Sequence, residues 1–104
     1  MSEVVIKINE RLDSGNVDAL KKDVASNLEK SDVDLILDFS NTKFIDSIGL
    51  GTLVSILKQT AQKNVKVVLT SLSPQVRQIF ELTRLYRLFD IVDSVDDAIQ
   101  AMKE

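Results

Sequence analysis

The residues best suited to chemistry are an acidic and a hydroxyl side chain, Asp46 and Ser47, where an apolar segment gives way to a helical pattern. Short polar side chains open helices because their oxygens accept hydrogen bonds from first-turn amides that have no helical partner. A phosphate on a hydroxyl there would meet the positive end of the helix dipole. The pair therefore suits a phosphorylation switch at Ser47. A plain helix cap explains the same residues, and the pattern alone leaves both interpretations open.

The helix that should follow Ser47 carries two glycines, Gly49 and Gly51, in its first turn. Each glycine weakens a helix by up to ~1 kcal/mol relative to alanine, so the pair calls for a reason beyond helix stability. A surface of small side chains that another chain can approach closely is one such reason. On a helical wheel, the side expected to face the core consists of Leu50, Leu53, Val54, Leu57 and Ala61. The predicted docking surface consists of Asp46, Ile48, Gly49, Gly51, Thr52 and Ser55.

Composition excludes several other classes of site. The 104 residues are 44% hydrophobic and 28% charged with a formal net charge of −3, as in a globular domain. An acidic chain without a run of Lys or Arg is not expected to bind nucleic acid. Histidine and cysteine are absent from the sequence. The common zinc sites, and the Ser–His and Cys–His nucleophile pairs, therefore cannot be built from this chain alone.

A small enzyme or nucleotide-binding protein is an alternative of another class. Such a protein would use Asp38, at the end of a predicted strand, together with Asp46 and the Gly49-x-Gly51 turn. The dinucleotide fingerprint needs a third glycine, however, and Val54 stands at that position. The acidic residues are more simply explained as solvated surface charges. We therefore expect neither a metal nor a cofactor site.

The N-terminus lacks the basic region and long apolar core of a signal peptide. No apolar run approaches the ~20 residues that span a bilayer. We accordingly expect a cytoplasmic protein that does not associate with membranes.

Strand and helix patterns alternate four times along the chain. Strands are expected at 4–8, 33–39, 65–70 and 89–92, with helices at 17–29 and 47–62. Ser73-Pro74 should open a third helix and Ser94 a fourth. Asp13, Ser14 and Asn16 lie in the turn before the first helix, and Ser14 or Asn16 is its predicted cap. This order favours one α/β domain over residues 1–104, with parallel neighbouring strands.

The chain resembles the STAS domain family and, within it, the bacterial anti-sigma factor antagonists. The strongest part is the segment Phe44-Ile45-Asp46-Ser47-Ile48-Gly49-Leu50-Gly51, which is similar to the family signature Asp-Ser-(Ser/Thr)-Gly-Leu-Gly. Leu12-Asp13 and Leu72-Ser73-Pro74 add to the resemblance. It implies a single STAS domain with a mixed sheet of four to five strands and about four helices mainly on one side.

The resemblance also implies a mechanism. In such antagonists the serine after the aspartate, here Ser47, is phosphorylated by an anti-sigma factor that is also a serine-protein kinase. The unphosphorylated form binds the anti-sigma factor and releases the sigma factor, and a PP2C-type phosphatase restores that form. The domain would then be a kinase substrate and binding module rather than an enzyme. Asp13, Ser14 and Asn16 would add weaker contacts to the docking surface.

Ile48 departs from the family pattern, which usually has Ser or Thr at this position, so a second phosphoacceptor is missing. Some STAS relatives are never phosphorylated and act as scaffolds or as subunits of stress-signalling or transport complexes. In that alternative Ser47 is only a helix cap.

Overall fold

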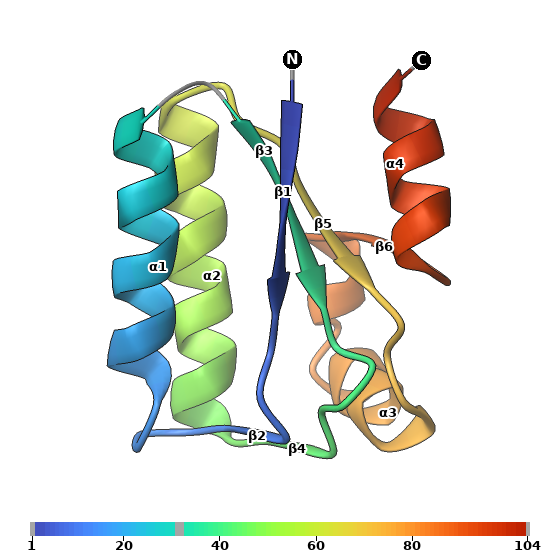
Figure 1. Ribbon diagram of the computed structural model, residues 1–104. Coiled ribbons are helices and arrows are strands. Elements are labelled where there is room, and N and C mark those ends of the chain that lie inside the picture. Colours follow the sequence, from blue (N-terminus) through green and yellow to red (C-terminus); the bar gives the residue numbers. More distant parts are fainter. Residues whose placement is uncertain (1, 31–32, 104) are drawn as a thin grey trace.

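The chain is organised around a parallel sheet. The computed structural model describes residues 2–30 and 33–103, and within them four strands pair in the order β1-β3-β5-β6 (Figure 1). Their bounds are Ser2–Lys7 for β1, Val33–Asp38 for β3, Val67–Thr70 for β5 and Asp90–Val92 for β6. Two further short strands, β2 (Arg11–Leu12) and β4 (Phe44–Ile45), form a second parallel pair.

The predicted α/β class is confirmed, with one correction to the sheet. Every pairing among the described strands is parallel, so the sheet is not mixed. The reason is that helices carry the chain back between sheet neighbours, as a parallel connection requires. The prediction is one sheet of four to five strands. Among the described residues, four strands form the main sheet and two more form a separate small sheet.

Four α-helices lie within the described ranges and occupy nearly the predicted positions: α1 (Val17–Lys30), α2 (Ser47–Gln62), α3 (Pro74–Leu82) and α4 (Val95–Lys103). A short 3-10 turn, η1 (Leu85–Arg87), follows α3. The predicted caps of α3 and α4 are confirmed. The Ser73 hydroxyl accepts the Val76 amide at 3.3 Å, and the Ser94 hydroxyl accepts the Asp97 amide at 3.0 Å.

The predicted cap of α1 is wrong. Asn16 does precede the helix, but its side-chain oxygen accepts the amide of Asp13 at 3.0 Å instead of a helix amide. Its side-chain nitrogen donates to the carbonyl of Arg11. The Asn16 side chain therefore closes the turn before α1, because both its polar groups point back along the chain.

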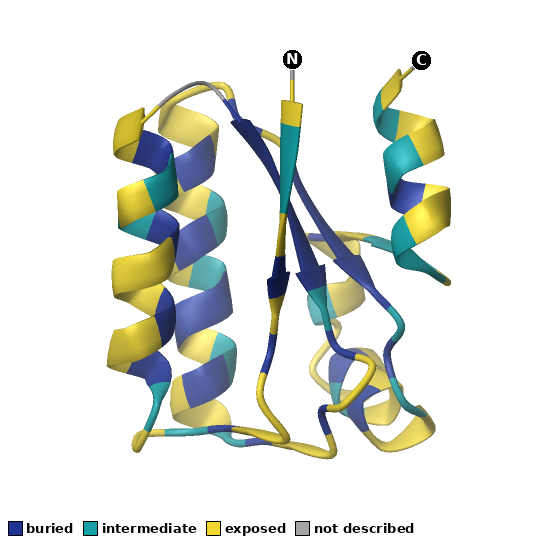
Figure 2. Ribbon diagram, in the orientation of Figure 1, coloured by how far each residue is buried: buried dark blue, intermediate teal, exposed yellow. Residues whose placement is uncertain are grey.

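Two apolar clusters cover opposite faces of the sheet, as alternation along a strand requires. The larger contains Leu35, Leu37 and Leu69 of the strands with inward residues of α1 and α2. Val76 and Phe80 of α3 belong to it too, so three helices share this core as predicted. The smaller cluster joins Ile36 and Val68 to Ala98 of α4. Figure 2 shows β3 and β5 buried, whereas much of β1 is not.

No helix in the described parts of the chain combines the length and apolar character that crossing a membrane requires.

A pair of leucine truncations tests this assignment of the core. Leu37 is fully buried in β3, whereas Leu82, the last residue of α3, is 77% exposed. Leu37→Ala should lower the free energy of unfolding by about 2–5 kcal/mol, because it removes buried methyl groups and leaves a cavity. Leu82→Ala should change it by less than about 0.5 kcal/mol. Urea unfolding of both variants measures the difference, and equal effects would contradict the placement of β3.

Candidate functional site

The small β2–β4 ladder brings two distant segments together. Arg11 pairs with Phe44 and Leu12 with Ile45, and the Asp46 amide then donates to the Leu12 carbonyl at 3.2 Å. This ladder joins the segment before α1 to the segment before α2. Both helices consequently begin at the same end of the molecule, the lower end in Figure 1. The sequence-predicted residues near 13–16 and 46–55 thereby belong to one region.

Asp46, and not Ser47, is the cap of α2. Asp46 has extended backbone angles (φ −94°, ψ −177°), and its Oδ1 accepts the Gly49 amide at 2.8 Å. Its carbonyl accepts the Leu50 amide at 3.0 Å, which begins the helix. Ser47 is therefore the first helical residue, and it is exposed. Because Asp46 satisfies the first-turn amide, the Ser47 hydroxyl is not needed for capping.

Gly49 is required by the fold of the chain itself. It is buried, and a β-carbon added to it would overlap the Leu12 carbonyl oxygen and lie 2.9 Å from Cγ2 of Ile45. The first turn of α2 can approach the β2–β4 ladder this closely only without a side chain at position 49. The prediction that Gly49 lines an exposed docking surface is wrong for this reason.

Thr52 is the second correction to the predicted surface. It is 4% exposed, and its hydroxyl donates to the Ile48 carbonyl at 2.9 Å. The buried residues of α2 are Gly49, Thr52, Leu53, Ile56 and Thr60, while Leu50, Val54 and Leu57 are only half-buried. The helix is rotated relative to the predicted wheel because it packs against both α1 and β4. Thr52 therefore cannot reach a partner.

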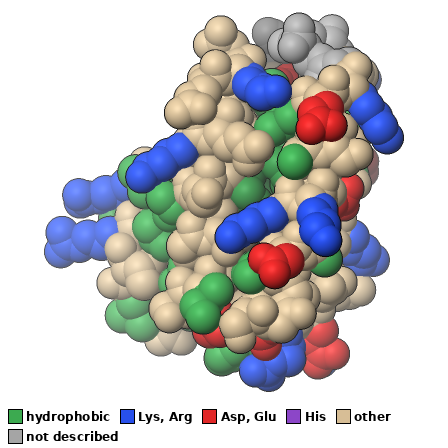
Figure 3. Space-filling view, turned by 90° about the vertical axis from the view of Figure 1, so that its left-hand side faces the viewer, with side chains coloured by type: hydrophobic (Ala, Val, Ile, Leu, Met, Phe, Trp, Pro, Cys, Tyr) green, Lys and Arg blue, Asp and Glu red, His purple; other side chains and the backbone are tan. Residues whose placement is uncertain are grey.

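The remaining predicted residues of α2 do form a surface. Ser47, Ile48, Gly51 and Ser55 are all exposed, and nothing lies within 4 Å of a β-carbon placed on Gly51. Ile48 is 50% exposed, so it offers apolar area at the surface. We call these four residues, with Phe44, the α2 surface. Figure 3 looks onto the α1 and α2 side and shows apolar side chains at several places on it, including its lower end.

Phe44 and Arg11 are additions that the sequence reasoning missed. Phe44 is 39% exposed, and the Arg11 guanidinium carbon lies 4.3 Å from the centre of its ring. Such a cation–π contact holds an aromatic ring in place at the surface. The available signal was the alternation of Phe44 with Ile45, since Ile45 points inward and its neighbour must then point outward.

The turn before α1 is ordered by its own hydrogen bonds. Asp13 accepts from the Arg11 side chain at 3.2 Å and from the Gly15 amide at 3.0 Å. Asp13 and Asn16 are half-buried, whereas Ser14 is exposed. Of these three predicted contact residues, Ser14 is thus the most accessible, and the other two shape the turn that presents it.

The geometry does not favour the nucleotide-binding alternative. Gly49 and Gly51 lie inside α2 with ordinary helical backbone angles, so Gly-x-Gly forms no loop around a phosphate. Asp38 Oδ1 accepts the Ser40 amide at 2.9 Å, and Asp46 Oδ1 accepts that of Gly49, so each carboxylate already has a local partner. Over residues 2–30 and 33–103, no group of three acidic side chains is placed to hold a metal ion.

The described residues thus form a parallel α/β domain with an exposed serine at the first position of α2. The model of the STAS domain family matches residues 2–98. The chain therefore belongs to the STAS domain family.

Two similar proteins are provisionally described as anti-sigma factor antagonists. BtrV of Bordetella bronchiseptica is 31% identical over 70 residues, which are 67% of this chain and 60% of BtrV. The match thus spans less than two thirds of that relative. The crystal structure of TM1081 from Thermotoga maritima is 28% identical with a TM-score of 0.85, over 99% of this chain and 92% of that one.

A third protein has a similar fold but a lower sequence identity. The anti-sigma factor antagonist SpoIIAA of Bacillus, in its unphosphorylated form, is 21% identical with a TM-score of 0.75. That match covers 98% of this chain and 90% of SpoIIAA. Its phosphorylated form matches nearly as well, with a TM-score of 0.73.

The two glycines of α2 provide a matched test of the site. Gly49→Ala should lower the free energy of unfolding by about 1–3 kcal/mol, because the new methyl group forces α2 away from Leu12. Gly51→Ala should raise it by up to about 1 kcal/mol, because alanine is the better helix former and has open space here. Urea unfolding measures both. Stabilisation by Gly49→Ala would contradict the close approach of α2 to the ladder.

The capping assignment gives a second test. Asp46→Ala should destabilise the protein by about 1 kcal/mol, since the Gly49 amide loses its acceptor, while Asp46→Asn should retain most of the stability. Ser47→Ala should change the unfolding free energy by less than about 0.5 kcal/mol. Thermal and urea unfolding compare the three variants. A larger loss in Ser47→Ala than in Asp46→Ala would show that the cap is assigned to the wrong residue.

Proposed function

We propose that this protein is an anti-sigma factor antagonist whose binding to an anti-sigma factor is switched off by phosphorylation of Ser47. The observation that carries the proposal is that Asp46 caps α2, which leaves the Ser47 hydroxyl exposed and free of a capping role. The antagonist names of the similar proteins support the choice of partner.

The partner would dock on the α2 surface. Its exposed residues are small or apolar, with Ile48 beside Ser47 and Gly51 open on the next turn. Small side chains allow another backbone to approach α2 closely, and an exposed isoleucine supplies apolar area for burial. Phe44, fixed under Arg11, extends the apolar part of this surface beyond the helix start.

Phosphorylation would act on binding more than on folding. A phosphate adds a charge of about −1.5 to −2 at Ser47, and the amides and dipole at the start of α2 tolerate an anion there. Ser47 is exposed, so the core is not disturbed. In the complex, however, the same group would have to lose its water against a surface of small and apolar residues. A thousandfold weaker complex needs only ~4 kcal/mol, which a misplaced dianion can supply.

The chain contributes the acceptor, and its partners contribute the catalysis. In the kinase reaction the Ser47 oxygen attacks the γ-phosphorus of ATP, ADP leaves, and a base on the kinase takes the hydroxyl proton. In the reverse direction a PP2C-type phosphatase would use water to release inorganic phosphate and regenerate the serine. We place these reactions in the cytoplasm, with the anti-sigma factor as the serine kinase.

Phosphate transfer to Ser47 is the first arm of the test. Incubation with ATP and the anti-sigma factor of the same organism should add one phosphate, seen by intact mass and mapped to Ser47. Ser47→Ala should abolish the addition. Ser26→Ala, which removes an exposed hydroxyl of α1 outside the α2 surface, should leave it unchanged. Absence of phosphate on the unaltered protein, or a phosphate mapped elsewhere, would contradict the proposal.

Binding is the second arm. By titration calorimetry the unphosphorylated protein and Ser47→Ala should bind the anti-sigma factor with dissociation constants within about threefold of each other. The phosphorylated protein should bind about a thousandfold more weakly. Equal affinity of both forms would instead support a scaffold that phosphorylation does not regulate.

A further inference from the structure

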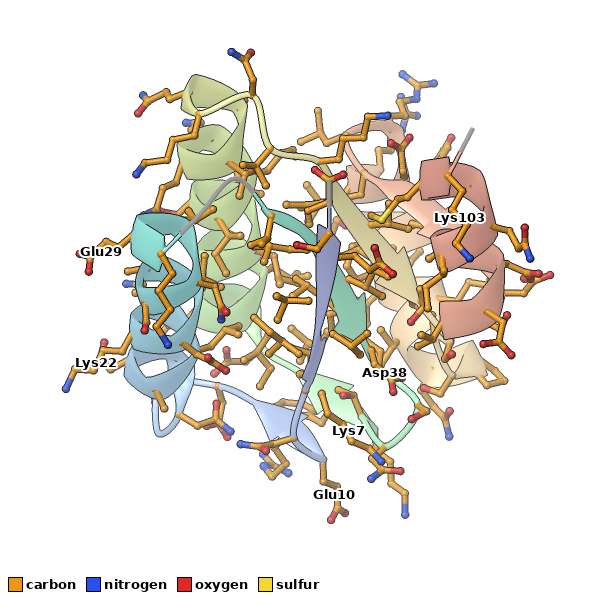
Figure 4. All side chains as sticks on the ribbon, turned by 45° about the horizontal axis from the view of Figure 1, so that its top comes forward. Lys7, Glu10, Lys22, Glu29, Asp38 and Lys103 are labelled. Atoms are coloured by element: carbon orange, nitrogen blue, oxygen red, sulfur yellow. The ribbon has the colours of Figure 1, made fainter. Side chains whose placement is uncertain are left out.

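The outer edge of β1 has no neighbouring strand among the described residues, since β1 ends the order of the main sheet. Figures 1 and 4 both show β1 in front of the sheet, with no helix or strand drawn across its outer side. β1 is six residues long, and half of them are exposed. An uncovered edge of this length is a template on which another strand can pair.

The register of β1 fixes which backbone groups face outward. The Ile8 amide donates to the Asp38 carbonyl of β3 at 2.8 Å, and the peptide groups of successive residues alternate in direction along a strand. The amide and carbonyl groups of Val4, Ile6 and Ile8 consequently face β3. Those of Glu3, Val5 and Lys7 are directed away from the sheet.

The side chains of these three outward-bonding residues share one face. Val5 is in register with Ile36, which packs under α4. That helix covers Ile36 completely but leaves Val5 44% exposed. In the part of the chain that the structure describes, neither Glu3 nor Lys7 makes an ion pair within 4.0 Å. The exposed Val5 therefore lies between the carboxylate of Glu3 and the ammonium of Lys7, and neither charge has an ion-pair partner among the described residues.

Glu3, Val5 and Lys7 are complementary to the same three residues of a second copy when a twofold axis passes beside Val5. In an antiparallel pair of β1 strands with Val5 opposite Val5, Glu3 of each copy lies opposite Lys7 of the other. All three positions on each strand then exchange amide–carbonyl hydrogen bonds, because these are the residues whose groups face outward. Opposite charges directly across an antiparallel pair are favourable, and like charges are unfavourable. We propose that the partner of this edge is a second copy of the chain, joined through β1 in this register.

This contact is closed and small. A twofold strand pair uses the β1 edge of both copies and leaves no further β1 edge, so it stops at a dimer. One pair of six-residue strands should bury less than the ~1,200–2,000 Å² of stable interfaces, so we expect a weak dimer that forms only at high protein concentration. Because the strands run in opposite directions, the two α2 surfaces point to opposite ends of the dimer and both stay accessible.

Charge exchange at positions 3 and 7 tests the register. By sedimentation velocity between about 10 µM and 1 mM, the unaltered protein should shift from monomer to dimer with rising concentration. Glu3→Lys and Lys7→Glu should each weaken self-association at least tenfold, because each places like charges opposite one another. The doubly exchanged protein, Glu3→Lys with Lys7→Glu, should regain the dimer.

Mixing the two single variants is the sharper measurement. One strand then has lysines at both positions and the other has glutamates at both, so every cross-strand pair is complementary. The mixture should form a heterodimer at least as tight as the unaltered homodimer. Glu29→Lys and Lys22→Glu make the same charge changes at exposed positions of α1, away from β1 in Figure 4, and should leave self-association unchanged.

Circular dichroism checks that each variant is folded, because every comparison requires folded protein. A monomer at all concentrations would overturn the proposal and would mean that Glu3 and Lys7 protect the edge against pairing. A dimer that ignores the charges at positions 3 and 7, or a mixture that forms no heterodimer, would overturn it as well.

Discussion

The candidate site depends on one close approach, that of the first turn of α2 to the backbone of Leu12. A buried glycine permits this approach, and the hydrogen bond from the Asp46 amide to the Leu12 carbonyl fixes it. Together they set where α2 begins and which residue becomes its cap. Once Asp46 holds the cap, Ser47 falls on the first helical position with its side chain outside the core. The accessibility of the serine thus follows from packing around a residue that is itself hidden.

Much of the fold could be predicted because its signals are local. The apolar run of β3, the Ser73-Pro74 start of α3 and the Asp46-Ser47 boundary each depend on neighbouring residues alone. The rotation of α2 could not be predicted in this way. A wheel places the largest apolar residues inward, but α2 packs against both α1 and β4, and its buried side includes Gly49, Thr52 and Thr60 as well as Leu53 and Ile56. Two-residue strands such as β2 and β4 are also too short to leave a periodic signal.

Some of the predicted contact residues lie at the surface in the structure. These are the residues whose side chains neither pack in the core nor make local hydrogen bonds. Gly51, Ser55 and Ile48 contribute little to the core, so the fold does not account for their identity. Gly49, Thr52, Asp13 and Asn16 are occupied with packing or with local hydrogen bonds. Residues of the two sets are interspersed in the sequence. The three-dimensional contacts are therefore needed to tell the exposed residues from those that support them.

The order of strands in the main sheet follows their order in the chain, and this bears on how the protein forms as it is synthesised. Each new strand, from β1 through β3 and β5 to β6, joins the edge that the previous one provided, and none is inserted between two earlier strands. The ribosome therefore releases strands in the sequence in which the sheet can grow. The exception is the cover over Ile36 and Val68, which α4 supplies only after all four strands of the main sheet have been made. Until α4 is in place, Ile36 and Val68 leave an apolar sheet face without its cover, and exposed apolar surface of this kind favours aggregation.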